Sequence, residues 1–185
     1  MNRSKTSEKW IKAGYELFAS QGLDGVRVER VARMLGLNKS GFYHYFVDLD
    51  NFSRQLIQHH STAFDAFLED VGQCQNIDPE YISVLIKHKI TIMGQIHLVG
   101  DRGSRLLNGT HKALDDKIDF AILDIWADHI QLPNNLSLAL EYHKLVRDAF
   151  YSRVNLENFN YEYLHTLAEE TKGIVAKMIK EKTNV

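Results

Sequence analysis

The 185-residue sequence has few of the features that mark secreted, disulfide-bonded or membrane proteins. Its single cysteine, Cys74, excludes an internal disulfide framework and favours a reducing compartment. No segment approaches the run of ~20 apolar residues that a membrane span needs. The polar first twelve residues lack the apolar centre of a secretion signal. We therefore expect a soluble, cytoplasmic protein that can bury a large core without disulfides.

Proline is also scarce, and strand patterns are lacking. Pro79 and Pro133, the two prolines, lie at boundaries between segments of helical periodicity. No segment alternates polar and apolar residues with the period of two that is typical of a strand. The sequence therefore predicts an all-α fold. The expected helices cover residues 7–21, 28–35, 38–46, 48–72, 78–99, 110–130, 136–154 and 161–182, with a short helix within 100–109.

Several residues are placed to begin or end these helices. Gly22 and Gly36 follow helical segments, where a glycine in the left-handed conformation commonly ends a helix. Asn38, Asp48 and Asp78 are expected to cap helix N-termini. Asp78 is followed by a proline at the first helical position, where the missing N–H is harmless.

The net charge of −2 conceals an uneven distribution of charge along the chain. Residues 1–46 carry eight Lys or Arg and four Asp or Glu, whereas residues 47–185 carry 14 basic and 20 acidic residues. A basic head on an acidic body is typical of a module that binds a polyanion joined to a module that does not.

Residues 28–46 have the pattern of two short helices joined by a tight turn at Gly36. Such a pair presents its second helix to the major groove of DNA. Ala32 is small where the two helices must cross. Side chains expected in the core are Val28, Val31, Leu35, Phe42 and Phe46. Side chains expected to face outward, where they can reach phosphates and base edges, are Lys39, Ser40, Tyr43 and His44.

This segment resembles the N-terminal DNA-binding domain of the TetR (tetracycline repressor-like) family of regulators. The resemblance rests on Val31-Ala32, on Leu35-Gly36-Leu37 and on the aromatic ending Gly41-Phe42-Tyr43-His44-Tyr45-Phe46. It implies a homodimeric repressor that binds double-stranded operator DNA at an inverted repeat and responds to a small-molecule effector. It further implies a helix-turn-helix domain in residues 1–47 and a larger helical effector-binding and dimerisation domain in residues 48–185. No enzymatic activity, cofactor or metal is expected.

The resemblance also implies which residues contact DNA. These are Arg27, Asn38, Lys39, Ser40, Gly41, Tyr43 and His44. One position departs from the family, because Leu49 stands where a lysine usually contacts phosphate. The loss of one phosphate contact is expected to weaken binding and to lower the log–log salt slope by about one unit.

For the larger domain, the resemblance implies an effector cavity and a dimer interface. Such cavities are mostly apolar with a few polar groups. The candidates for the cavity are Phe64, Phe67, Met93, His97, Phe120, Trp126, Tyr142 and Phe150. The last two expected helices have apolar stripes that would pair across a two-fold axis. The candidates for this interface are Leu138, Tyr142, Leu145, Ala149, Leu164, Leu167, Ala168, Thr171 and Val175.

Two alternatives to a regulator remain open. The first is a helical enzyme with a magnesium site formed by Asp115, Asp116, Asp119, Asp124 and Asp128, although we interpret these aspartates as a solvated helix face. No two of the nine histidines are three or four residues apart, so a local His-x-x-x-His metal site is lacking. The second alternative is a helical ligand-binding or interaction protein with a weakened DNA-binding head, which Leu49 favours.

Overall fold

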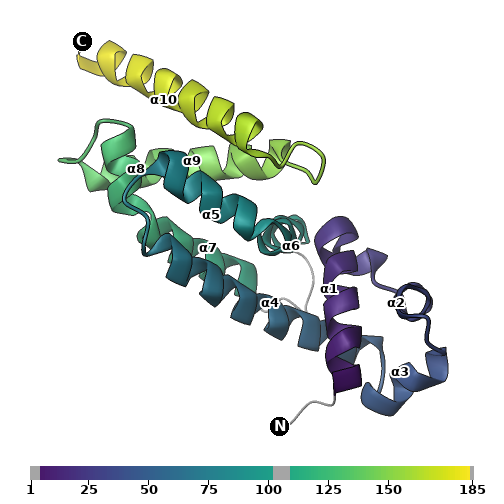
Figure 1. Cartoon of the computed structure of the whole chain (residues 1–185). Coiled ribbons are helices and arrows are strands. Elements are labelled where there is room, and N and C mark those ends of the chain that lie inside the picture. The colour runs from purple at the N-terminus through teal and green to yellow at the C-terminus, as the bar shows by residue number, and fades with distance from the viewer. Residues whose placement is uncertain (1–4, 102–108, 184–185) are drawn as a thin grey trace. The chain divides into compact units, whose positions relative to one another are not determined.

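The computed structural model describes residues 5–101 and 109–183, without the side chains of residues 179–183. Every regular element in this range is helical, which confirms the predicted fold class (Figure 1). The elements are α1 (Lys5–Gly25), α2 (Val28–Leu35), α3 (Lys39–Tyr45), α4 (Leu49–Val71), the single turn η1 (Ile77–Tyr81), α5 (Ile82–Lys87), α6 (Lys89–Gly100), α7 (Thr110–Ala121), α8 (Leu123–His129), α9 (Leu136–Arg153) and α10 (Tyr161–Thr183). No helix in the described part combines the length and the apolar character needed to cross a membrane.

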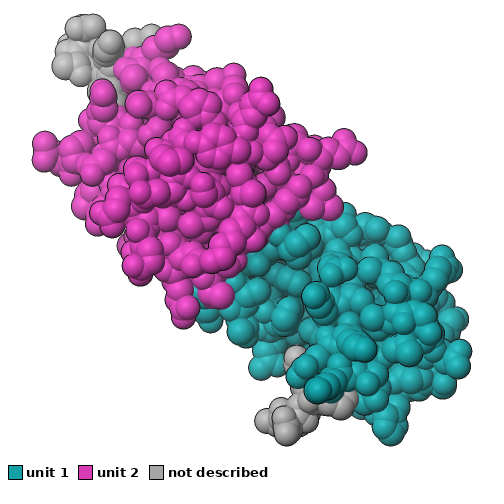
Figure 2. All heavy atoms as spheres, viewed as in Figure 1, with its two compact units in different colours: residues 1–65, 90–114 teal, residues 66–89, 115–185 magenta. Residues whose placement is uncertain are grey.

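The chain divides into two compact units (Figure 2). Unit 1 comprises residues 1–65 and 90–114, and unit 2 comprises residues 66–89 and 115–185. Helices α4 and α7 each contribute to both units. The division predicted at residue 47 concerns function, and it stays a prediction.

Two of the expected helices are broken, and the single-helix predictions for residues 78–99 and 110–130 are wrong. The first breaks at His88, whose backbone leaves the α-helical region while its ring contacts the Asp70 carboxylate. The second breaks at Ile122, between α7 and α8. Neither position is a glycine or a proline, so no local signal marks the breaks. The short helix expected within residues 100–109 lies mostly outside the described residues.

The caps follow the predictions in part. Asp48 caps α4, because its Oδ1 accepts a hydrogen bond from the Asn51 N–H at 2.7 Å. Gly22 has the expected positive φ of 70°, and α1 kinks there. Asn38 occupies the N-cap position of α3 without a capping hydrogen bond from its side chain. The prediction for Asp78 is wrong, because its carboxylate binds Tyr161 and His165 and does not cap a helix.

The core of unit 1 is rich in aromatic rings from α1, α3 and α4. Trp10 of α1 meets Phe42 of α3 edge-on, with 5.5 Å between ring centroids. Phe52 of α4 contacts Phe42 with 5.2 Å between centroids. Gly14 permits this packing, since a Cβ there would lie 2.5 Å from the Phe52 ring. The aromatic cluster therefore fixes α3 against α1 and α4.

The core of unit 2 forms around Trp126, which packs with Ile122, Ala127, Ala139 and other apolar residues from α8 to α10. The Trp126 Nε1 donates a hydrogen bond to the Ala139 carbonyl at 2.9 Å. Burial of the indole is therefore compatible with full use of its N–H.

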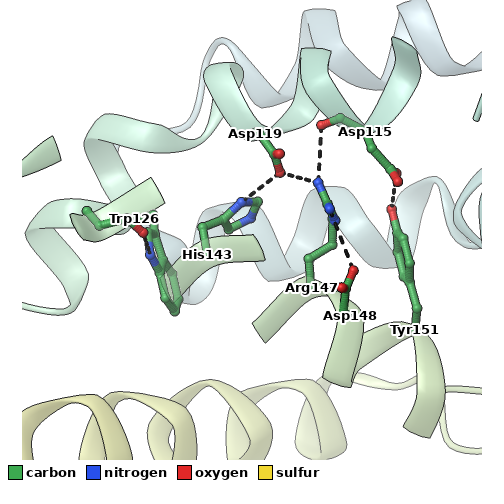
Figure 3. A network of polar contacts seen from close by, with 8 residues as sticks. Asp115, Asp119, Trp126, His143, Arg147, Asp148 and Tyr151 are labelled. Atoms are coloured by element: carbon green, nitrogen blue, oxygen red, sulfur yellow. Dashed lines mark hydrogen bonds and ion pairs between the residues drawn. The ribbon is translucent and has the colours of Figure 1, made fainter. Parts of the chain in front are cut away.

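Unit 2 also buries a polar network between α7 and α9 (Figure 3). Asp119, only 2% exposed, accepts from His143 Nδ1 at 3.0 Å and pairs with the Arg147 guanidinium. Tyr151 donates its hydroxyl hydrogen to Asp115 at 3.0 Å. Our interpretation of the aspartate series as a solvated face is therefore wrong for Asp115 and Asp119, which are buried. It holds for Asp116, Asp124 and Asp128, which are exposed.

Candidate nucleic-acid interface

The turn between α2 and α3 depends on the left-handed backbone of Gly36 (φ 65°, ψ 30°). In this conformation the Gly36 N–H donates to the Arg33 carbonyl at 3.2 Å, and the Leu37 N–H donates to the Ala32 carbonyl at 2.9 Å. These two bonds satisfy carbonyls that the end of α2 would otherwise leave without partners. A Cβ at Gly36 would meet no atom within 4 Å, so the requirement is one of backbone conformation.

The substitution Gly36→Ala is expected to lower the free energy of unfolding by about 1–2 kcal/mol, the cost of a left-handed L-residue. Gly41 provides a matched control, because it lies inside α3 and a Cβ there also has open space. Gly41→Ala is expected to stabilise the protein by about 0.5–1 kcal/mol. Urea denaturation measures both changes, and equal effects of the two substitutions would contradict the account.

Helix α3 has one buried and one exposed face. Phe42 is fully buried, and Phe46, which follows the helix, is buried as well. Tyr43 is 60% exposed. Among the other candidates for DNA contacts, Gly41 is half-buried. The exposed candidates are Asn38, at the N-cap of the helix, and Lys39, Ser40 and His44. Hydrogen-bonding side chains thus project from a helix that is anchored by aromatic packing.

The charges around this face are partly paired. Lys39 Nζ lies 2.7 Å from Glu29 Oε1, so the two helices of the pair are bridged across the turn. The hydrogen bond from Lys39 lowers the pKa of Glu29. Arg30 donates to the Gln21 side chain and to the Gly25 carbonyl, the latter at 3.4 Å. Arg27 is exposed at the start of α2.

Sequence reasoning did not identify Glu29 as part of this site. Glu29 and Lys39 are ten residues apart and lie on different helices, so no spacing within one helix relates them. Their contact follows only from the angle at which α3 leaves the turn.

Leu49 is the first residue of α4 and is exposed. It lies between Asp48, which caps the helix, and Asp50, which is also exposed. Asp48 is therefore explained by helix capping. No cation occupies the position of Leu49 or of its two neighbours in the sequence.

The candidates for an effector cavity are divided between the two units. Phe64, Met93 and His97 belong to unit 1, and the other five belong to unit 2. Phe64, Phe67, Met93, Trp126 and Tyr142 are buried, and His97 and Phe150 are half-buried. Phe120 is 71% exposed, so it does not line the interior of the single chain. The sequence pattern did not reveal that Asp119 contacts His143 and Arg147 inside unit 2.

The candidates for a dimer interface also differ in exposure. Tyr142, Leu164 and Val175 are buried within the chain itself. Leu145 is 66% exposed. The remaining candidates are half-buried; they are Leu138, Ala149, Leu167, Ala168 and Thr171. Two further apolar side chains of α10, Ile174 and Met178, are exposed.

Among the described residues, no three His, Cys, Asp or Glu side chains are grouped closely enough to hold a metal ion. Asp115 and Asp119 engage tyrosine, histidine and arginine instead.

Comparison with known proteins identifies the head. Residues 11–50 match the family model of bacterial regulatory proteins of the tetR family. The N-terminal part of the chain is therefore similar to proteins of that family. The matched residues include α2, the turn at Gly36 and the whole of α3.

Two relatives illustrate how far the likeness extends. The chain is 36% identical over 58 residues to YwcC, an uncharacterized HTH-type transcriptional regulator of Bacillus subtilis (strain 168). This stretch covers 31% of the chain and 26% of the relative, about a quarter of its length. The crystal structure of a transcriptional regulator (TerR/AcrR family) from Aquifex aeolicus VF5 has a TM-score of 0.60, with 18% identity over 94% of this chain and 99% of that one. The second likeness concerns the fold alone.

Proposed function

We propose that the protein is a homodimeric, sequence-specific transcription regulator whose helix α3 enters the major groove of operator DNA. The observation that carries the proposal is the two-sided character of α3. Phe42 fixes the helix to the core, while Tyr43 and the neighbouring polar side chains project into solvent. Such a rigid helix with exposed donors and acceptors suits both phosphate and base-edge contacts.

The roles of individual residues follow from their chemistry. Lys39 carries the positive charge of the exposed face and can reach a phosphate or a guanine edge. Asn38 and Ser40 can donate to and accept from base edges, and Tyr43 and His44 can bind the backbone or bases. Arg27 supplies a further phosphate contact from the start of α2. Because Leu49 contributes no charge, the salt dependence is expected to be about one unit of slope lower than with a lysine there.

Removal of the Glu29 carboxylate is expected to strengthen DNA binding. Lys39 must leave Glu29 to bind a phosphate, and the carboxylate itself repels the phosphate backbone. An exposed ion pair is weak, so Glu29→Gln should raise the affinity only about two- to fivefold. Titration of labelled duplex measures the change. The control is Glu162→Gln, since Glu162 is an exposed glutamate on α10. If Glu29→Gln binds DNA no better than this control, the result would contradict the role of Lys39.

Dimerisation would bring two copies of α3 to two half-sites about one helical turn apart. We infer that the interface includes the exposed apolar side chains Leu145 of α9 and Ile174 and Met178 of α10. Exposed apolar groups on neighbouring turns favour association with a complementary surface, and a second copy of the chain supplies such a surface by symmetry.

We also infer that the protein acts in the cytoplasm and that a small-molecule effector binds in residues 48–185. Effector binding would change the spacing of the two recognition helices through α4. An effector shifts this equilibrium only by the difference between its affinities for the two states.

Selection of duplexes from a random pool at two salt concentrations tests the proposed function. The purified protein is expected to enrich an inverted repeat at both concentrations. Enrichment of unrelated duplexes at low salt alone would contradict the proposal, because sequence-independent binding of that kind is purely electrostatic. That result would favour a helical interaction protein with a weakened head.

A further inference from the structure

A buried chain of hydrogen bonds crosses unit 1 from α1 to the first turn of α7. The Tyr15 hydroxyl of α1 lies 2.9 Å from His60 Nδ1 of α4. His60 Nε2 lies 3.1 Å from Gln95 Oε1 of α6. Gln95 Nε2 donates to the His111 carbonyl of α7 at 3.0 Å. Tyr15, His60 and Gln95 are all buried, the last two completely.

The chemistry of these groups fixes the direction of every hydrogen bond. The Gln95 amide nitrogen donates to the His111 carbonyl, so the amide oxygen faces His60. That oxygen can only accept, and His60 Nε2 must therefore carry the ring proton. In the neutral ring the Nδ1 atom is then an acceptor, and the Tyr15 hydroxyl donates to it. Each of the three links has one donor and one acceptor.

The surroundings of His60 are closely packed. The Phe18 and Phe64 rings each lie 5.9 Å from the imidazole, centroid to centroid. Gly94 of α6 brings its backbone so close that a Cβ would lie 3.1 Å from His60 Nδ1 and 3.0 Å from Phe18. A broken link to His60 would therefore leave one of its buried ring nitrogens without the partner described above, which is costly in an apolar interior.

Helix α1 joins this chain to the recognition helix. Trp10, which meets Phe42 of α3 edge-on, lies five residues before Tyr15 on α1. That separation is about 7.5 Å along the axis of a helix. The same helix thus contacts α3 near one end and the hydrogen-bond chain near its middle.

We propose that His60 and Gln95 are positioning residues for DNA binding, although neither lies on α2 or α3. A displacement of α6, or of the first turn of α7, must either move α1 with it or break a buried hydrogen bond. The chain therefore transmits the position of α6 to α1, and α1 transmits it to α3 through Trp10 and Phe42. This inference rests on the proposed function, and it names the contacts through which the larger domain acts on the head.

Two substitutions break the chain at different links with little change of shape. Gln95→Met removes the hydrogen bonds to His60 and to the His111 carbonyl and keeps a side chain of similar length. Tyr15→Phe removes the hydroxyl alone and keeps the ring. Ile57→Val is the matched control, because Ile57 is buried in the same core, lies on α4 and forms no part of the chain.

Affinity for the selected duplex, measured under conditions in which all variants are folded, is the first readout. Each substitution in the chain is expected to change the affinity about tenfold, a typical effect of residues that couple two sites. The double variant should differ from the stronger single variant by less than twofold, since both substitutions break one chain. Ile57→Val should bind within twofold of wild type. Wild-type affinity of both single variants, or additive effects in the double variant, would overturn the inference.

Hydrogen exchange is the second readout, and it does not depend on DNA binding. Gln95→Met is expected to speed amide exchange in α1 and α3 as well as in α6. Exchange that changes only around residue 95 would overturn the inference. Failure to select any duplex would overturn the proposed function instead, while the exchange experiment would still test the chain. If Gln95→Met does not fold, both the affinity and the hydrogen exchange are measured on Tyr15→Phe.

Discussion

Replacement of Arg147 by methionine is expected to lower the free energy of unfolding by about 3–5 kcal/mol, the cost of leaving a buried charge without its partner. Asp119 is 2% exposed, and Arg147 pairs with it inside unit 2 (Figure 3). Burial opposes the charged form of Asp119, but the hydrogen bond from His143 and the guanidinium of Arg147 outweigh this effect and lower its pKa. Without Arg147, only His143 remains to compensate the carboxylate.

Arg153→Met serves as the control in the same urea denaturation experiment. Arg153 is exposed and lies in the last turn of the same helix, α9. Its replacement is expected to change the stability by no more than ~0.5 kcal/mol. Equal destabilisation by the two substitutions would show that the network does not stabilise unit 2.

A second large effect is expected on acidification. Burial lowers the pKa of His60 from 6.5 to about 4. Between these pH values the unfolded chain binds a proton at His60 and the folded chain does not, so stability falls as the pH falls. The contribution of His60 to the free energy of unfolding is therefore complete above pH ~6.5 and is lost progressively as the pH falls toward ~4. With 1.36 kcal/mol for each pKa unit, the loss is about 3 kcal/mol.

The groups that face His60 guide the experiment. Tyr15, Gln95 and the neighbouring His59 surround the ring, and none of them supplies a negative charge at neutral pH. Burial also lowers the pKa of His97 and of His129, which act in the same direction. The contribution of His60 is therefore the difference between wild type and His60→Gln, measured by urea denaturation from pH 7 to pH 4.

His44→Gln, a substitution of an exposed histidine on α3, should keep the wild-type pH dependence. Parallel stability curves for wild type and His60→Gln would contradict the assigned protonation of His60.

The head could be predicted from sequence because its determinants are local. The apolar spacing from Val28 to Phe46 defines two helices, and a glycine at position 36 defines the turn. The Glu29–Lys39 ion pair escaped prediction, because it joins different helices. In this part of the chain, the backbone conformation and the core follow from neighbouring residues.

The larger helical part was less predictable because its important contacts are not local. Asp119 and Arg147 are 28 residues apart, and nothing in the spacing of the aspartates indicates that two of the five are buried. The breaks at His88 and Ile122 lack glycine and proline. At His88 the break coincides with a contact to Asp70, 18 residues away in the sequence. Burial of Leu164 and Val175 within their own chain likewise could not be read from an apolar stripe.

The same distinction applies to the hydrogen-bond chain of unit 1. Along the sequence, Tyr15 lies 45 residues from His60, and His60 lies 35 residues from Gln95. Tyr15 and His60 belong to the apolar stripes of their expected helices, and no spacing in the sequence relates them to each other or to Gln95. Their relation as donor and acceptor appears only when α1, α4 and α6 are placed together.

The measurement that tests the account most directly is the affinity of Tyr43→Ala for the duplex that the wild-type protein selects. Tyr43 is 60% exposed on α3, so its loss should leave the fold intact. Phe120→Ala, at a residue that is 71% exposed on α7, is the matched control. If α3 reads the major groove, Tyr43→Ala will bind at least ~10-fold more weakly, while Phe120→Ala will bind as wild type does. Wild-type affinity of a folded Tyr43→Ala variant would contradict the assignment of α3 as the recognition helix.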